Sequence, residues 1–580
     1  MAGIDPITYQ TLLSSITAIV DEMQYQMYRS AYSTIIRESL DASCALLTKE
    51  GQVIVQHAFL PLHLGVFPRV IESIRDNYEI EEMREGDAFI TNHPYHGAPH
   101  SPDLATARPI FYKGELVAFS CNMAHKSDMG GMVPGSGSSK ATELFQEGLI
   151  LPPIKYCRQG EVVRELERII ATSSRTPRLV IGDIRTQIGA NKIGSERLRA
   201  LLDRHGVEII NAFLERLFDS TEKQLRLHLA GWEDKTVEAE GFIDGNGIDN
   251  DTRVRLHARV TVKGDRIYFD LSDCDAQQKG PVNIRPFLIR SAAHYALLCM
   301  TEGSIPNNHA LNRVVEIKVR EGTVVHPVQP ASTNCYIITV QKLTEVLLRA
   351  LGNFNPERAI ADTGGDGAFV IGSRDARTGR PSIQYEILGS AYGGGNGQDG
   401  TSGVGVHLAN CRAASIEVIE TEFPARLLRF DLIQDSGGPG KYRGGLGFRR
   451  EYQVLEDGSR FTMRCDRHAV APEGIRGGKQ GKLGSCTINP GTEREKRLPA
   501  LFADVILKKG DIVRVERPGG GGFGDPLDRA LDDVLRDVLE KYVSVEGARE
   551  MYGVGIDESS MKIDEQETAS FRSRLRNVSS

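Results

Sequence analysis

Glycine clusters in the second half of the chain constrain its fold more than any other feature of the sequence. The clusters Gly393–Gly395, Gly437-Gly438, Gly444-Gly445 and Gly519–Gly522 fall between short apolar runs. This pattern is typical of strands joined by tight turns and bulges, and glycine also lets one backbone segment pass close to another. We therefore expect a glycine-rich, β-rich C-terminal region.

The first 235 residues are predicted to mix helices with strands. Asp5-Pro6 is a helix start, because Asp can cap the first turn and Pro fits within it. Apolar residues then recur at helical spacing as far as Met27. Strand pairs are predicted at residues 44–47 with 53–55 and at 109–112 with 116–119, and helices at 186–203 and 207–229.

Composition excludes several classes of protein. The formal net charge of −7 leaves no surplus of Lys and Arg to neutralise phosphates, which argues against a nucleic-acid partner. The N-terminus has no secretory signal, and the apolar runs are far below the ~20 residues of a membrane helix. Nine cysteines are scattered without a CxxC pair, which is typical of a reducing compartment. We expect a cytoplasmic protein that makes no membrane contact.

The densest polar cluster lies between residues 91 and 135, in a loop, a predicted hairpin and a second loop. It holds several of the 14 histidines of the chain. Its members are His93, His96, His100, Asp103, His125 and Asp128.

Three members of this cluster can meet in space. Pro99 and Pro102 stiffen the loop that carries His100 and Asp103. A hairpin returns its far end beside its origin, so His125 can lie next to that loop. Two imidazoles and one carboxylate suit a divalent metal with open positions for water or substrate. The alternative is that these histidines cap and hydrogen-bond loops, because HxxD alone is a weak pattern.

A second candidate is Asp41, which precedes the strand predicted at residues 44–47. A carboxylate at the entry of a strand can project into a cleft and serve as a further metal ligand or as a general base. The alternative is structural: Arg37 and Glu38 would form a surface ion pair, and Asp41 would cap a turn.

Nucleotide binding by this chain is not expected. Residues 395–400 match GxGxxG, but the residues that follow do not have the pattern of a helix. The chain also lacks a GxxxxGK[ST] loop and a GxSxG elbow. We assign no cofactor-binding residues to it.

Ten ordered segments between about Asp5 and Val554 carry a resemblance to a known family. They are RESLDASCALLTKEG, FLPLHLG, NHPYHGAPHSPD, AHKSDMGG with PGS, EGLILPP, GDIRTQ, KGPVN, GGGNGQDG, SGGPGKYRGGLG and RPGGGGFGDP. Through them the chain resembles the hydantoinase B/oxoprolinase family, which includes B subunits of ATP-dependent hydantoinases and lactamases and large subunits of acetone and acetophenone carboxylases. It departs from the family at His93, where NDP is usual, and at Lys126, where a second His is usual.

The resemblance implies roles for the residues already singled out. The family's segments matching HSPD and AHKSD supply ligands to a divalent metal, which corresponds to His100, Asp103 and His125 here. The Asp matching ESLD lies near the same site, so Asp41 is a candidate ligand or base. Asp41 and His125 are then the expected catalytic residues. The ligands are N and O atoms, so manganese, zinc and iron are all admissible.

The resemblance also implies a reaction shared between two subunits. A hydantoinase A-type, actin-like partner would bind ATP and phosphorylate a small cyclic amide. This chain would then open the activated ring of a hydantoin, 5-oxoproline or lactam with the help of its metal. The alternatives are a subunit of an ATP-dependent ketone carboxylase of the acetone or acetophenone type, and a non-catalytic scaffold. A hetero-oligomer that receives ATP through the partner is expected.

Together these patterns predict an α+β multidomain protein, with a mixed α/β N-terminal metal-binding region before the glycine-rich, β-rich region. Residues 1–235 would form the metal-site domain, 236–310 a β-hairpin and helix segment, 311–526 the glycine-rich domain and 527–580 a C-terminal helix and tail. Within them we expect paired strands at 237–273 with a turn at 263–265, helices at 289–301, 340–351 and 527–542, and a polar end from 557 that is loose or docked on a partner.

Overall fold

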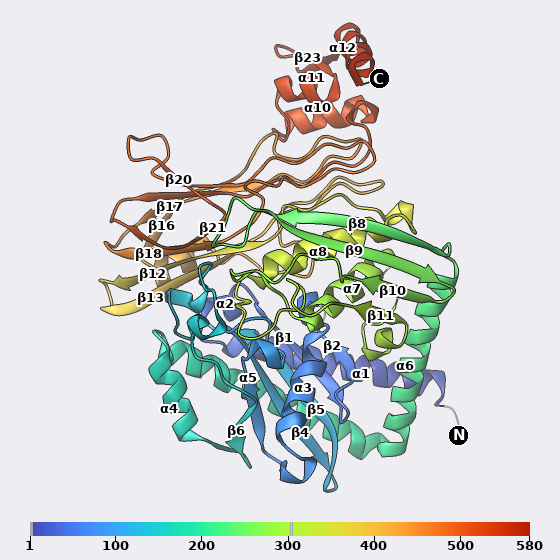
Figure 1. Cartoon of the computed structure of the whole chain (residues 1–580), viewed down its shortest axis with the longest axis vertical. Coiled ribbons are helices and arrows are strands. Elements are labelled where there is room, and N and C mark those ends of the chain that lie inside the picture. The colour runs from blue at the N-terminus through green and yellow to red at the C-terminus, as the bar shows by residue number, and fades with distance from the viewer. Residues whose placement is uncertain (1–3, 58, 302, 304, 580) are drawn as a thin grey trace.

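The structure, a computed structural model, describes residues 4–57, 59–301, 303 and 305–579 (Figure 1). Its N-terminal part is built on a seven-stranded antiparallel sheet with the strand order β2-β1-β5-β4-β3-β6-β7. The strands are β1 Ala42–Thr48, β2 Val53–Gln56, β3 Ala88–Thr91, β4 Asp103–Tyr112, β5 Glu115–His125, β6 Ile154–Arg158 and β7 Glu161–Val162. Both predicted strand pairs are confirmed, as β1 with β2 and β4 with β5.

Helices cover this sheet on both sides. The first helix begins as predicted, because the Asp5 carboxylate accepts hydrogen bonds from the amides of Ile7 and Thr8, each at 3.0 Å. Every residue of β1 is buried, and successive side chains enter different cores, as the period of a strand requires: Leu46 packs with α1, α5 and α6, and Leu47 packs in the core that holds α3. The helices of this part are α1 Pro6–Ser30, α2 Thr34–Arg37, α3 Val66–Asn77, α4 Arg164–Ser173, α5 Pro177–His205 and α6 Val207–Ala230.

A second sheet, of four strands in the order β11-β10-β9-β8, lies across α7 and α8 from the first (Figure 1). The turn predicted at 263–265 joins β9 to β10, and Gly264 there has a φ of 61°. Apolar residues of both sheets and both helices form one core. The elements are β8 Lys235–Ile243, β9 Val254–Lys263, β10 Arg266–Asp270, β11 Val315–Lys318, α7 Pro286–Met300 and α8 Tyr336–Leu351.

The C-terminal part is rich in strands, as expected. A four-stranded sheet (β13-β12-β18-β21) and a five-stranded sheet (β16-β17-β22-β19-β20) share an apolar core that includes Phe369, Tyr452 and Phe461. The elements are β12 Gly367–Asp375, β13 Arg380–Leu388, β14 Ser390–Ala391, β15 Ser402–Val404, α9 Ile416–Glu422, β16 Ala425–Leu432, β17 Phe448–Val454, β18 Ser459–Arg464, β19 Ser485–Ile488, β20 Lys496–Leu498, β21 Leu501–Leu507 and β22 Ile512–Glu516.

The four glycine clusters form closely packed backbone segments, and a tight turn of the predicted kind is present at Gly395, which exchanges backbone hydrogen bonds with Gln398. None of their glycines has a positive φ. A Cβ atom on Gly520 would lie only 2.1 Å from the carbonyl oxygen of Tyr392. The Gly520 amide donates to the carbonyl of Gly445 at 3.0 Å, and its own carbonyl accepts from the amide of Gly438 at 2.8 Å. These segments pack backbone against backbone, and only glycine leaves room for that.

The chain ends in a small lobe, at the top of Figure 1. The helix predicted over 527–542 is shorter than expected, because Pro526 begins a separate 3-10 turn and Lys541 has a φ of 62°. The elements of the lobe are α10 Leu531–Leu539, α11 Val545–Tyr552, β23 Gly555–Asp557, β24 Lys562–Asp564 and α12 Glu565–Ser579.

The described part of the polar end, residues 557–579, folds into this lobe as part of β23, β24 and α12, so it is not the loose end that was one of the two expectations, and docking on a partner stays a prediction. The Thr568 hydroxyl accepts from the amide of Gly555 at 3.0 Å, and the guanidinium of Arg572 donates to the carbonyl of Arg529 at 2.8 Å. Side-chain hydrogen bonds hold this segment where apolar burial is scarce.

The fold class is therefore as predicted, a mixed α+β protein with several sheets. The domain limits at residues 235, 310 and 526 stay predictions. Within the described residues, no helix is long and apolar enough to cross a membrane.

Candidate metal centre

The hairpin of β4 and β5 brings Asp103 and His125 together. Asp103 is the first residue of β4, His125 is the last residue of β5, and the two are paired in the antiparallel register. The Asp103 Oδ1 atom lies 3.1 Å from Nδ1 of His125. The inference that a hairpin returns His125 to the HSPD loop is confirmed in this geometry.

His100 completes the cluster from the loop before β4. Its Nε2 atom is 3.3 Å from Nδ1 of His125 and 3.4 Å from Oδ2 of Asp103. The amide of Asp103 donates to the carbonyl of His100 at 3.1 Å, which fixes the loop against the strand. All three side chains are buried.

A backbone carbonyl sets the tautomer of His100. Its Nδ1 atom lies 3.0 Å from the carbonyl oxygen of Asn334, which can only accept, so Nδ1 carries the hydrogen. The lone pair of Nε2 therefore points into the cluster. Asn334 is held in turn, because its Nδ2 donates to the carbonyl of Ser136 at 2.7 Å and its Oδ1 accepts from Arg464 at 3.0 Å. Such outer hydrogen bonds are typical of metal-binding histidines.

The donor set fits a divalent cation. One ligand atom from each of His100, Asp103 and His125 lies within 4.8 Å of the other two. Two imidazole nitrogens and a carboxylate oxygen suit manganese, zinc or iron. The other ring nitrogen of His125, Nε2, is buried and has no hydrogen-bond partner among the described residues. The protein alone thus leaves a polar atom of this cluster unsatisfied.

Neighbouring charges and burial shift the pKa values of Asp103 and His125 toward the charge states that bind a cation. Burial alone would raise the pKa of Asp103, but the adjacent His100 and His125 outweigh it and hold that pKa well below its usual range. Burial lowers the pKa of His125 to about 4. An ionised carboxylate beside a neutral imidazole is the state that a cation requires of its ligands.

Asp41 lies at the edge of the cluster. Its Oδ2 atom is 4.0 Å from Nδ1 of His125, and its carbonyl accepts the His125 amide at 3.2 Å. Leu40 just before it has a φ of 61°, a left-handed conformation that is unfavourable for a leucine. Burial, with the negative charge of Asp103, raises the pKa of Asp41 well above its ordinary value.

The alternative in which residues 37–41 have only a structural role holds in part. Arg37 and Glu38 do form an ion pair, at 2.9 Å. The Asp41 carboxylate, however, accepts no hydrogen bond from a backbone amide within the described part of the chain, so it caps no turn there. Its side chain is 19% exposed and faces His125.

The other polar residues of the sequence cluster lie apart from the three. The rings of His93 and His96 are 4.5 Å from each other, and His93 Nδ1 caps a short turn by accepting the Tyr95 amide at 3.1 Å. Asp128 accepts from the amide of Gly135 and from Arg175, each at 2.9 Å. These residues organise loops.

Lys126 stands where the family usually has a second His, and it is not one of the three converging ligands. It is buried, and its ammonium donates to the carbonyl of Ala124 at 3.1 Å. Burial lowers the pKa of Lys126 to about 8.

Several residues around the centre were missed from the sequence. The Tyr336 hydroxyl donates to Oδ2 of Asp103 at 3.3 Å, and the ring of Tyr385 lies 4.6 Å from that of His125. His63 is buried near Asp103, with its Nδ1 2.6 Å from the Ser43 hydroxyl. His63 lies in FLPLHLG, one of the segments that carry the family resemblance, which was a usable signal. The two tyrosines belong to none of the motifs that the sequence marked.

Comparisons with known proteins identify the family and the fold. The family model described as Hydantoinase B/oxoprolinase matches residues 5–526. A proposed B-type component of a D-/L-hydantoinase from Pseudomonas sp. (strain NS671) is 34% identical, over 98% of each chain. The crystal structure of the ATP-dependent caprolactamase from Pseudomonas jessenii superposes with a TM-score of 0.91 at 27% identity, covering 98% of this chain and 100% of the other. An acetone carboxylase structure shares the fold, with a TM-score of 0.91 at 21% identity over 99% of this chain and 83% of that one.

Proposed function

The chain belongs to the hydantoinase B/oxoprolinase family, and on that premise we propose that it is the metal-dependent catalytic subunit of an ATP-dependent cyclic-amide hydrolase. Its substrate would be a hydantoin, 5-oxoproline or lactam ring that a partner subunit has phosphorylated. The observation that carries the proposal is the convergence of His100, Asp103 and His125, with the Nε2 lone pair of His100 directed at the other two.

The proposed ligands are His100, Asp103 and His125, with Asp41 as a further ligand or as the base. A divalent cation bound there would supply Lewis acidity and lower the pKa of a bound water. Asp41 would take the proton from the attacking water, because its carboxylate adjoins His125 and keeps some access to solvent. His125 is the second proposed catalytic residue, since its Nε2 is free to meet a reacting group.

Arg464 provides positive charge beside these groups. It is buried, and its guanidinium lies 5.2 Å from the centroid of the Tyr385 ring. It has no ion pair with a carboxylate in the ranges that the structure describes, and its charge opposes the rise in the pKa of Asp41. We propose that this charge helps to hold an anionic, phosphorylated substrate at the centre.

The partner would be a hydantoinase A-type, actin-like subunit that binds ATP, and the two would form a hetero-oligomer. An unstrained amide is a poor electrophile, and phosphorylation of its oxygen would make the ring carbon more electrophilic. Water would add to that carbon, the ring C–N bond would break as the nitrogen takes up a proton, and a second water would convert the resulting acyl phosphate to carboxylate and phosphate. This chain has no GxxxxGK[ST] loop, so the partner would use the ATP, and this chain would act only on the phosphorylated substrate. The nine cysteines are all free thiols, and we propose a cytoplasmic location on that basis.

Co-expression with the partner tests the proposal. The complex should consume ATP and open the ring of at least one cyclic amide, with no need for bicarbonate. Consumption of ATP only with a ketone and bicarbonate would instead assign the chain to the carboxylase branch, whose fold it shares. No ATP-dependent conversion of either class would overturn both.

A further inference from the structure

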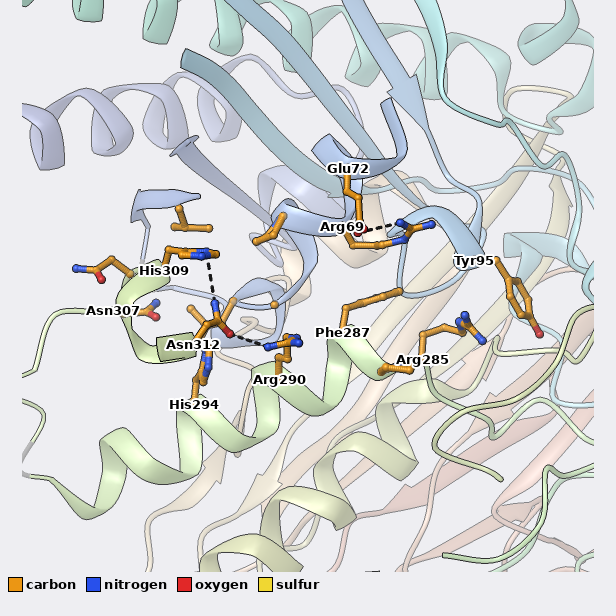
Figure 2. Close-up of a pocket in the computed structure, with 16 residues that line it drawn as sticks. Arg69, Glu72, Tyr95, Arg285, Phe287, Arg290, His294, Asn307, His309 and Asn312 are labelled. Carbon is orange, nitrogen blue, oxygen red and sulfur yellow. Dashed lines mark hydrogen bonds and ion pairs between the residues drawn. The ribbon is translucent and has the colours of Figure 1, made fainter. Parts of the chain in front are cut away.

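A cavity of about 580 Å³ lies outside the metal centre, between α3, α7 and the 3-10 turn η6, His309–Arg313 (Figure 2). Arg69 lines it from α3, Arg285 from the residue just before α7, and Arg290 from α7 itself. Leu64 and Phe287 provide apolar walls. A volume of this size suits a small organic ligand, since such sites usually measure roughly 300–1,000 Å³.

Arg285 is held rigidly, yet its charge is not neutralised. Its guanidinium stacks 4.2 Å from the centroid of the Tyr95 ring, and Nη1 donates to the carbonyl of Pro327 at 2.5 Å. Its Nε is buried with no hydrogen-bond partner, and no carboxylate pairs with it in the part of the chain that the structure describes. A positioned guanidinium of this kind is suited to an oxyanion.

A second arginine begins a chain of oriented hydrogen bonds. Arg290 Nη1 donates to Oδ1 of Asn312 at 2.9 Å, and Asn312 Nδ2 lies 3.5 Å from Nδ1 of His309 (Figure 2). Because an amide nitrogen only donates, Nδ1 of His309 accepts and its Nε2 carries the hydrogen. That Nε2–H has no acceptor among the described residues, and Arg290 has no carboxylate partner there.

His294 adds an unsatisfied buried atom to the same wall. It is 3% exposed, and its Nε2 has no hydrogen-bond partner within the described ranges. Burial, with the positive charge of Arg290 and the nearby His309, lowers the pKa of His294 to about 3. The positive charge of Arg285 likewise helps to lower the pKa of His93 to about 4, after burial and the neighbouring His96. The surroundings of the cavity are thus electropositive.

We propose that this cavity binds a small organic anion through a phosphate or carboxylate group. Arg285, Arg290 and His309 supply the donors, and the remainder of the ligand lies against Leu64 and Phe287. Among the described residues, the only carboxylate lining the cavity is that of Glu72. It is exposed and pairs with Arg69 at 2.9 Å, so two cations stay available for the ligand.

The cavity adjoins the metal centre through the chain at residues 61–65. His63 lies close enough to Asp103 and His100 for their charges to affect its pKa, and the next two residues, Leu64 and Gly65, line the cavity. Gly65 is tied to α7, because its amide donates to the hydroxyl of Ser291 at 2.9 Å. The two sites are therefore neighbours with separate donor sets.

Calorimetric titration of the full chain tests the proposal. Inorganic phosphate, glycerol 3-phosphate and succinate are titrated at constant ionic strength, after chelation of divalent metal. Saturable binding of at least one of them is expected, and Arg285→Gln and Arg290→Gln should each weaken it by about tenfold or more. Arg168→Gln is the matched control: Arg168 is exposed on α4, outside the cavity, and its loss removes the same charge.

Two further arms keep the outcome decisive. His125→Ala should bind the same probe unchanged, because the metal centre is not this site. If Arg285→Gln does not fold, the exposed Arg290 still provides the test. The proposal is overturned if none of the three probes saturates, if both arginine variants bind as tightly as wild type, or if His125→Ala loses binding. Binding of only the two phosphate compounds would identify a phosphate site, and binding of succinate alone would identify a carboxylate site.

Discussion

Asp103 and His125 are direct cross-strand partners at the open end of the β4–β5 hairpin, with Oδ1 and Nδ1 3.1 Å apart. Asp41 meets the same end from the start of β1, where its carbonyl accepts the His125 amide. Three strand ends of one sheet thus fix these groups. Groups placed on a rigid sheet need little reorganisation when they bind a cation or a substrate.

Removal of a ligand should remove the metal. We expect the purified chain to carry a divalent ion, and His100→Ala and His125→Ala to lose it, because each change deletes one of three converging donors. Elemental analysis measures the content. His96→Ala is the matched control, since His96 lies in the same stretch of sequence but packs against His93. Unchanged metal in both ligand variants would contradict the assignment.

Asp41→Asn should lower turnover without affecting the fold. The change keeps the shape of the side chain and removes the charge beside His125, so loss of a base or ligand should cost ~10²–10⁴ in rate. The assay is product formation by the complex with ATP, together with a melting curve. If Asp41 were only structural, Asn would lower stability by at most ~1 kcal/mol and leave the rate nearly unchanged. Near-normal product formation would therefore show that Asp41 has only a structural role.

The fold was predictable where contacts are local in sequence. Both hairpins of the first sheet follow from short apolar runs around a turn, and Asp5 marked the start of α1. The predicted start of α5 was too late, because its buried face carries polar residues that hide the apolar period. Asp183 is one of them, and it accepts the amide of Tyr32 at 2.7 Å.

The candidate site was predictable only as far as it is local. His100, Asp103 and His125 lie within one hairpin and its loop, so turn geometry was enough. Asn334 and Tyr336 come from more than 200 residues further along the chain, and no periodic pattern encodes that approach. The close packing of the glycine backbones was likewise only one of two interpretations that the sequence allowed, the other being tight turns and bulges.

Tyr336→Phe should weaken metal binding. The hydroxyl donates to Oδ2 of Asp103 at 3.3 Å, and loss of such an outer hydrogen bond typically costs 10–100-fold in metal affinity. Competition with a chelator of known affinity measures the change. Tyr78→Phe is the control, because the Tyr78 hydroxyl makes no hydrogen bond among the described residues. Equal affinity in wild type and Tyr336→Phe would show that this hydroxyl does not support the ligand.

Acid should destabilise the chain partly through His294. Its folded pKa of about 3 lies below the ordinary value of 6.5, so between these values the unfolded chain binds more protons. The contribution to stability is therefore full above pH 6.5 and is lost as the pH falls toward 3. At pH 4 the loss should be ~3 kcal/mol, since one pKa unit corresponds to about 1.4 kcal/mol. The Tm difference between wild type and His294→Gln should shrink from pH 8 to pH 4, and parallel Tm profiles would contradict this.

The most direct measurement of the central claim is product formation by the reconstituted complex after this chain alone has been stripped of metal. The account predicts that ATP consumption by the partner continues, that ring-opened product falls by ~10² or more, and that added manganese, zinc or iron restores it. The isolated chain should turn over no ATP under any of these conditions. Undiminished product formation by the metal-free chain, with ATP still consumed, would contradict the account.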